Sequence, residues 1–198
     1  INLANNNSLA NITALPSSIS GGAMTLLATQ TASGSANLSF TSGIDSTYDS
    51  YVFKFYNIHP ATNGTFFQFN MSTDSGSNYN VAKTTTAFYA YHTESGSASA
   101  LTYDAGQDLA QGTGFQNLLY AISSDNDSAG SGELSIYSPS SDTFVKHFLA
   151  TSNTAATTPY TINFRYAGYG NTTSAVNAIR FQMSSGNFDG VIKLYGVS

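Results

Sequence analysis

The strongest constraint on the fold is a pair of aromatic segments separated by a turn. In residues 51–58 aromatic side chains occupy alternate positions, namely Tyr51, Phe53 and Phe55. This alternation is typical of a β-strand with one buried face. Pro60 has no amide hydrogen for a neighbouring strand, and Ala61-Thr62-Asn63-Gly64 supplies turn residues before a second aromatic segment at residues 66–69. We therefore predict two strands that pair antiparallel across this turn.

The next stretch, Ser72-Thr73-Asp74-Ser75-Gly76-Ser77-Asn78-Tyr79, resembles the Asp-box turn of sialidases and of many unrelated β-proteins. In that motif the Asp carboxylate accepts hydrogen bonds from backbone amides of its own turn, and the Gly has a positive φ. The resemblance implies that Asp74 and Gly76 are structural residues of a hairpin turn and not catalytic residues. The resemblance to sialidases would imply three arginines around a substrate carboxylate, and this chain has only Arg165 and Arg180, so we do not expect sialidase activity.

Further strand patterns follow one another along the chain, separated by turns rich in Gly, Ser and Asn. They lie at residues 23–30, 37–41, 79–92, 115–122, 133–137, 143–150, 160–167, 178–183 and 191–197. Residues 115–122 also fit a short helix, but their flanks rich in Gly and Ser favour a strand. Residues 95–114 fit a long loop with short strands or one helical turn near Asp108. This spacing, without a convincing helical period, predicts an all-β fold: an antiparallel β-sandwich of the jelly-roll type over residues 23–198.

Residues 1–22 show neither a strand period nor a helical period and end at Gly21-Gly22. Apolar residues recur in them at loose intervals: Leu3, Leu9, Ile12 and Leu15. We predict an extended N-terminal arm whose apolar side chains are covered by another surface. The alternative is a frayed terminus that packs on its own domain.

The composition argues against several classes of function. Charged residues make up 9% of the chain, and the six Lys and Arg residues are scattered singly, so we expect no nucleic-acid binding. No apolar run approaches the roughly 20 residues that span a bilayer, so we expect no membrane insertion, and the first residues lack the pattern of an export signal. The absence of Cys excludes disulfides and thiolate metal sites.

We find no constellation typical of a metal site. His59, His92 and His147 have no second ligand at a metal-binding spacing. Asp125 and Asp127 resemble the start of a calcium loop, but Ala129 and Ile136 occupy two ligand positions of an EF-hand. A looser calcium site at Asp125 and Asp127 and a plain solvated turn both stay open. We predict no metal and no cofactor.

Catalytic residues are not indicated either. The pairs Asp45 with Asp49 and Asp104 with Asp108 are the carboxylates that could act as glycosidase acid and base, but neither lies in a distinctive motif. We therefore predict a protein that is not an enzyme. Tyrosines that lie at the surface could stack on sugar rings, although core and interface packing explains them equally well. The candidates are Tyr89, Tyr91, Tyr103 and Tyr169.

The ordered succession of motifs resembles a group of structural proteins of tailed bacteriophages, especially marine ones. The matching segments cover nearly the whole chain: NNNSLANITALPSSI, residues 35–40, GIDSTYDSYVFKFYNIHPATNG, STDSGSNY, DLAQGTGFQNL, TFVKHF and AIRFQMSSGNFDGVIKLYGV. The resemblance implies a virion component of the decoration or tail-fibre type, made in the host cytoplasm and located on the particle surface. No functional site residue transfers with it.

From this resemblance we expect a capsid decoration or cement protein. It would be a homotrimer that protects its sheet edges between subunits and stabilises the head by binding the major capsid protein or other virion proteins through its arm. The alternative is the receptor-binding tip of a tail fibre, with a host-surface glycan as its ligand. A third interpretation is a phage depolymerase that uses Asp45 or Asp104.

Overall fold

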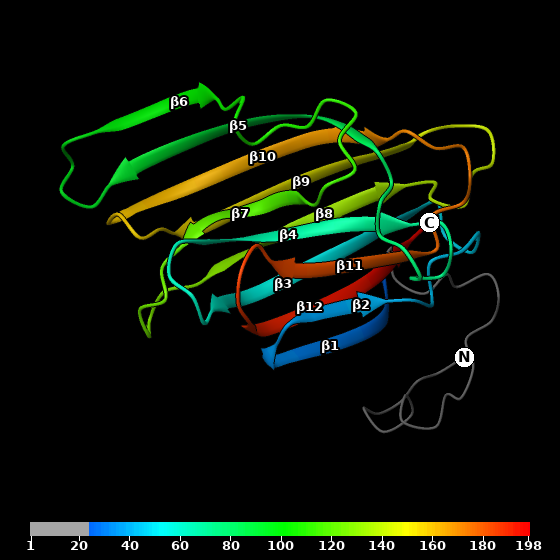
Figure 1. Cartoon of the computed structure of the whole chain (residues 1–198), viewed down its shortest axis with the longest axis horizontal. Coiled ribbons are helices and arrows are strands. Elements are labelled where there is room, and N and C mark those ends of the chain that lie inside the picture. Colours follow the sequence, from blue (N-terminus) through cyan, green and yellow to red (C-terminus); the bar gives the residue numbers. More distant parts are fainter. Residues whose placement is uncertain (1–23) are drawn as a thin grey trace, which may run out of the picture.

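Two antiparallel β-sheets face each other in the computed structural model, which describes residues 24–198 (Figure 1). The predicted arm, residues 1–22, lies outside the described residues. Residues 24–198 form twelve strands and no helix. The strands are β1 (Thr25–Ser35), β2 (Asn37–Phe40), β3 (Ser50–Pro60), β4 (Thr65–Ser72), β5 (Lys83–Thr93), β6 (Ser99–Tyr103), β7 (Gln116–Ile122), β8 (Gly130–Tyr137), β9 (Lys146–Ala155), β10 (Tyr160–Gly170), β11 (Ala178–Met183) and β12 (Phe188–Val197).

The strand order is that of a jelly roll with additional strands in one sheet. The long sheet has the order β1-β12-β3-β8-β9-β10-β5-β6, and the short sheet has the order β2-β11-β4-β7. The four strands β1-β12-β3-β8 and the four strands β2-β11-β4-β7 form the two layers of a jelly roll, and the chain crosses between these layers at nearly every connection. The predicted all-β antiparallel sandwich of the jelly-roll type is confirmed.

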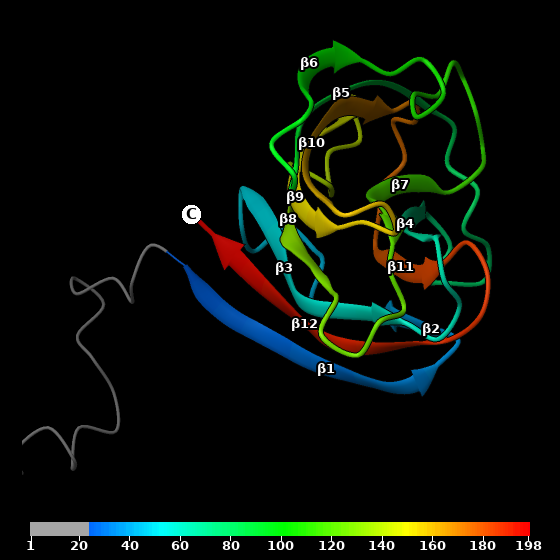
Figure 2. The same cartoon turned by 90° about the vertical axis from the view of Figure 1, so that its left-hand side faces the viewer.

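The remaining strands lengthen only the long sheet. β5 and β6 are inserted in the chain between β4 and β7, and β9 and β10 are inserted between β8 and β11. Together they continue the long sheet beyond β8, and we call these four strands the extension. Figure 2 shows that the long sheet curls from β1 and β12 round to β5 and β6, with the short sheet on its concave side. The short sheet ends at β7, so part of the extension has no strand facing it.

The predicted pairing of the two aromatic segments is wrong. β3 pairs with β12 and β8 in the long sheet, whereas β4 pairs with β11 and β7 in the short sheet. The turn after Pro60 therefore carries the chain from one layer to the other. Both strands have an aromatic face, and each face is buried by packing on the opposite sheet: the rings of Phe55 and Phe67 lie 5.4 Å apart across the sandwich.

The core between the two layers is dominated by phenylalanine. The ring of Phe67 stacks on Phe181 at 5.7 Å and contacts Phe188 edge-on at 5.5 Å, and Phe40 contacts both Phe53 and Phe181. All five side chains are at most 2% exposed. Aromatic pairs in these arrangements stabilise the fold beyond the area that they bury.

Two local predictions also need correction, and one is confirmed. The first strand does not end before Gly34: it continues to Ser35 through a register shift, with Gly34 at a φ of 57°. For residues 95–114 the first alternative is confirmed, because they form a long loop with the short strand β6 and no helical turn near Asp108. The turn at Asp74 does not form a hairpin, because it leads from β4 in the short sheet to β5 in the long sheet.

Candidate functional site

The Asp74 turn is held by its own side chains. The Asp74 carboxylate accepts hydrogen bonds from the backbone N–H of Asn78 at 2.8 Å and from the Ser72 hydroxyl at 2.7 Å. These hydrogen bonds lower the pKa of Asp74 to about 2, since they favour the ionised form. Gly76 has a φ of 90°, a conformation that favours glycine. All of these contacts organise the turn.

Three of the four carboxylates in the predicted acidic pairs accept local hydrogen bonds. Asp45 accepts hydrogen bonds from the N–H of Thr47 at 2.8 Å and from the Tyr51 hydroxyl at 3.0 Å, and these bonds lower its pKa. Asp108 accepts a hydrogen bond from the Tyr103 hydroxyl, and Asp104 accepts one from the N–H of Gly106. These contacts explain the carboxylates as turn and loop residues.

Histidines and acids do not converge in the described part of the chain. Residues 24–198 contain no group of three or more His, Cys, Asp or Glu side chains that could hold a metal ion. Asp125 and Asp127 lie exposed in a turn. The ring of His59 forms a 2.7 Å hydrogen bond with the carbonyl of Ser128, and His147 contacts the ring of Tyr169 on the outer face.

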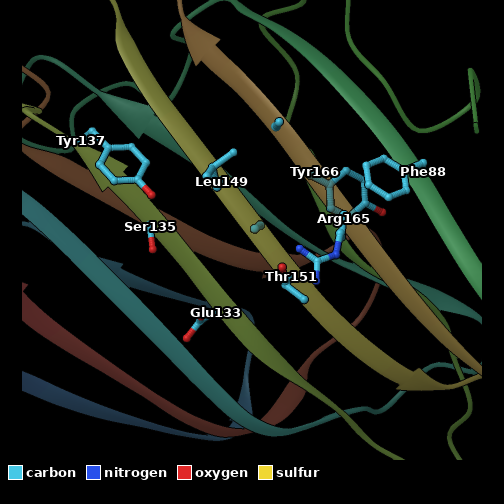
Figure 3. Close-up of a pocket in the computed structure, with 10 residues that line it drawn as sticks. Phe88, Glu133, Ser135, Tyr137, Leu149, Thr151, Arg165 and Tyr166 are labelled. Atoms are coloured by element: carbon cyan, nitrogen blue, oxygen red, sulfur yellow. The ribbon is translucent and has the colours of Figure 1, made fainter.

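The convex face of the extension carries exposed apolar side chains. Strand pairing places Glu133, Thr151, Arg165 and Phe88 side by side on β8, β9, β10 and β5. Leu149 and Tyr137 stand next to this row on the same face (Figure 3). Their exposure is high for apolar side chains: Phe88 is 41%, Tyr137 41% and Leu149 52% exposed. We call Phe88, Glu133, Tyr137, Leu149 and Arg165 the outer patch.

The outer patch is shallow and carries both signs of charge. Two cavities of about 290 and 430 Å³ lie along it, and both are lined by Tyr137, Leu149 and Ala167. Glu133 lies 3.8 Å from Lys54 in an exposed ion pair, whereas no salt bridge within residues 24–198 engages Arg165. Glu133 and Arg165 are two strands apart, which is about 10 Å. The patch therefore combines exposed apolar side chains with two opposite charges, which lie on either side of Thr151.

The concave face of the extension holds a second and different cavity. It has a volume of about 340 Å³ and is lined by tyrosine and threonine around one isoleucine: Tyr89, Tyr91, Thr93, Tyr120, Thr158, Tyr160 and Ile162. We call these seven residues the tyrosine groove. Tyr89, Tyr91 and Thr93 come from β5, Tyr160 and the buried Ile162 come from β10, and Tyr120 projects from β7 at the edge of the short sheet.

The rings of the groove pack on one another. Tyr91 lies 5.5 Å from Tyr160 and 6.1 Å from Tyr89, and Tyr89 and Tyr120 both pack on Phe164, at 5.0 and 5.4 Å. All four tyrosines are partly exposed. Burial raises the pKa of Tyr89 and Tyr160, and the neighbouring phenols add to this effect. The hydroxyls of Tyr89 and Tyr160 therefore stay protonated at neutral pH.

The structure brings together two of the four tyrosines selected from the sequence. Tyr89 and Tyr91 line the groove, whereas Tyr103 lies on β6 and Tyr169 on the outer face. Sequence reasoning missed Tyr120 and Tyr160. The only available signal was their place within strand patterns, and that signal does not reveal which strands are neighbours.

Within residues 24–198 no helix is long and apolar enough to cross a bilayer. The comparisons with protein-family models, with curated proteins and with solved structures yield no match to this chain.

Proposed function

We propose that this chain is a structural, non-enzymatic component of a tailed-phage virion, and more specifically a capsid decoration or cement protein that assembles as a homotrimer. The succession of sequence motifs that resembles phage structural proteins supports the virion assignment. The jelly-roll sandwich suits the role, because a packed double sheet withstands conditions outside the cell without disulfides. The observation that carries the assembly part of the proposal is the outer patch.

The outer patch has the character of an interface between copies. Its apolar residues lie on the strands β8, β9 and β5 of one sheet, so they form a fixed surface and not a mobile loop. Removing such a surface from water stabilises the assembled state by about 25 cal/mol per Å² of apolar area. Glu133 and Arg165 place both signs of charge beside the apolar side chains, so a neighbouring copy in a ring can meet the patch with a different surface that carries complementary charges.

The role of the arm remains part of this proposal. We propose that Leu3, Leu9, Ile12 and Leu15 contact a neighbouring subunit or the major capsid protein, and that many copies together then stabilise the head. Deletion of residues 1–22 tests this contact in a binding assay with undecorated capsids. Unchanged affinity and stoichiometry after the deletion would rule out the arm as the tether.

Self-association is tested with one charge introduced at the outer patch. We expect Leu149→Asp to convert the oligomer to a monomer in light scattering coupled to size exclusion, because the carboxylate would be buried in the interface. Leu26→Asp on β1 is the matched control, since Leu26 is 53% exposed and Leu149 is 52% exposed. A wild-type protein that is already monomeric at high micromolar concentration would refute the interface.

The place on the particle is tested by imaging. Antibody against this chain should label the heads of intact virions in electron micrographs. Label confined to the tail would refute the decoration role and support the receptor-binding tip of a tail fibre instead.

A further inference from the structure

We propose that the tyrosine groove binds a neutral saccharide. This inference does not rest on the proposed assembly function, because the groove lies on the concave face of the extension and the outer patch lies on its convex face. It adds a ligand site to a protein whose decoration role needs none.

The groove exists because the two sheets have different widths. The inward-facing side chains of β3, β8 and β12 are covered by the short sheet, but the short sheet ends at β7. The inward positions near the end of β5 and the start of β10 therefore line an open cavity. The volume of about 340 Å³ lies within the range of about 300 to 1,000 Å³ that is typical of small-molecule clefts.

The lining of this cavity combines apolar rings with neutral hydroxyl groups. Each phenol offers a flat apolar face and one hydroxyl that both donates and accepts a hydrogen bond. No hydrogen bond within residues 24–198 engages the hydroxyls of Tyr89, Tyr91, Tyr120 and Tyr160, and the Thr158 side chain is exposed at the rim. A sugar ring has the matching surface, with an apolar C–H face and hydroxyls around its edge.

The charge of the lining selects against other ligands. None of the seven lining residues is charged, so the groove offers no cation for a phosphate, a sulfate or an acidic sugar. Asp104 lies close enough to Tyr89 to raise its pKa, and its negative charge would oppose an anion further. A proline-rich peptide also docks on tyrosines, but it offers carbonyl acceptors without N–H donors and would leave the acceptor sites of the phenols unmatched.

The binding surface is rigid before any ligand arrives. Tyr89, Tyr91, Tyr120 and Tyr160 all project from strands, and their rings already pack on one another or on Phe164. Rings that are held in place lose little conformational entropy on binding, which lowers the energetic cost of forming a complex.

The test uses the full chain and defined oligosaccharides. The probes are maltohexaose, cellohexaose, mannohexaose and chitohexaose as neutral sugars, with hexagalacturonate and decaproline as the acidic and peptide alternatives. Binding is measured by calorimetry and by tyrosine fluorescence, to which the groove contributes four of the 13 tyrosines and which no Trp emission masks. We expect saturable binding of at least one neutral hexasaccharide and none of decaproline or hexagalacturonate.

Three variants locate the site. Tyr91→Ala should weaken binding about 10-fold or more through the lost ring contact. Tyr160→Phe keeps the ring and removes only the hydroxyl, so a loss of about threefold is expected, and this variant preserves the fold. Tyr103→Ala is the control, because Tyr103 is an exposed tyrosine on the neighbouring strand β6 that does not line the groove, and this variant should bind as the wild type does.

The following results would overturn the proposal. They are the absence of binding for all four neutral hexasaccharides at about 10 mM, equal binding by wild type and Tyr91→Ala, or preference for decaproline or hexagalacturonate. None of these results would affect the self-association test at Leu149, so the two proposals fail independently.

Discussion

Two regions of the sandwich use different aromatic residues on their inward faces. We call the part in which β1, β12, β3 and β8 face the short sheet the closed half, and we compare it with the extension. Where the short sheet covers the long sheet, the inward aromatic positions are almost all phenylalanine and are fully buried: Phe53, Phe55, Phe67, Phe69, Phe181 and Phe188. Where the cover ends, the inward positions around the cavity are tyrosine and are partly exposed: Tyr89, Tyr91, Tyr120 and Tyr160.

This difference shows that the cover over a strand decides the polarity of its inward side chains. A phenol needs water or a partner for its hydroxyl, whereas a phenyl ring needs neither. Tyr51 illustrates the rule inside the closed half, because it is fully buried and its hydroxyl is satisfied by Asp45. The concave face of the extension therefore carries aromatic side chains whose hydroxyls can contact water, whereas the aromatic side chains of the closed half are shielded from water.

The largest expected effect is at the centre of the closed half. Phe67→Ala removes a ring that packs on Phe55, Phe181 and Phe188, and we expect the free energy of unfolding to fall by about 3–5 kcal/mol. Urea denaturation followed by circular dichroism measures this loss. A loss below about 1 kcal/mol would mean that the closed half is not the stable part of the molecule.

The second prediction concerns Lys83, at the end of β5 that the rest of the protein covers. If this end is shielded from water like the closed half, the charged form of Lys83 is destabilised. Its ammonium is fully buried and donates hydrogen bonds to the Asn70 side chain, 2.5 Å away, and to the Val81 carbonyl, 2.9 Å away. Burial lowers the pKa of Lys83 from 10.5 to about 7, because the charged form is poorly solvated.

The sign of the pH dependence follows from this shift. Between pH 7 and 10.5 the unfolded chain binds more protons at this position than the folded chain does, so stability rises with pH. We expect a gain of about 2 kcal/mol between pH 7 and 9. Urea denaturation at several pH values measures it. Lys83→Met is the control and should flatten the slope; an unchanged slope in this variant would assign the effect to other groups.

Tyr166 does not follow the rule that a buried tyrosine hydroxyl has a hydrogen-bond partner. It lies on β10 in the extension, is 1% exposed, and its hydroxyl has no hydrogen-bond partner within residues 24–198. Burial raises its pKa well above the ordinary value. We expect Tyr166→Phe to stabilise the protein by about 1 kcal/mol, since an unpaired buried hydroxyl is removed while the ring contact with Phe164 is kept. Thermal denaturation would show the opposite, a loss, if a water molecule or residues 1–23 satisfied this hydroxyl.

The smallest effect is expected in the groove itself. Tyr91→Ala removes a partly exposed ring, so its cost to the free energy of unfolding should be about 1 kcal/mol or less. The same urea experiment that measures Phe67→Ala provides the comparison. A cost equal to that of Phe67→Ala would make the tyrosines part of the core, and their ligand role would then be unnecessary to explain them.

Several properties of this protein could be derived from its sequence because they depend on local spacing. The alternation in residues 51–58, 160–167 and 178–183 predicts strands, and the structure confirms them as parts of β3, β10 and β11. The spacing of strand patterns between glycine-rich turns, without helical periods, was sufficient to predict an antiparallel sandwich of the jelly-roll type.

The pairing of strands and the assembly of the groove were decided by the tertiary structure. Alternation indicates that a strand has one buried face, but it does not indicate which sheet covers that face, because this depends on contacts between residues far apart in the chain. For this reason β3 and β4 were expected to pair, although they lie in opposite layers. For the same reason Tyr120 and Tyr160 could not be grouped with Tyr89 and Tyr91: only the unequal widths of the two sheets bring them around one cavity.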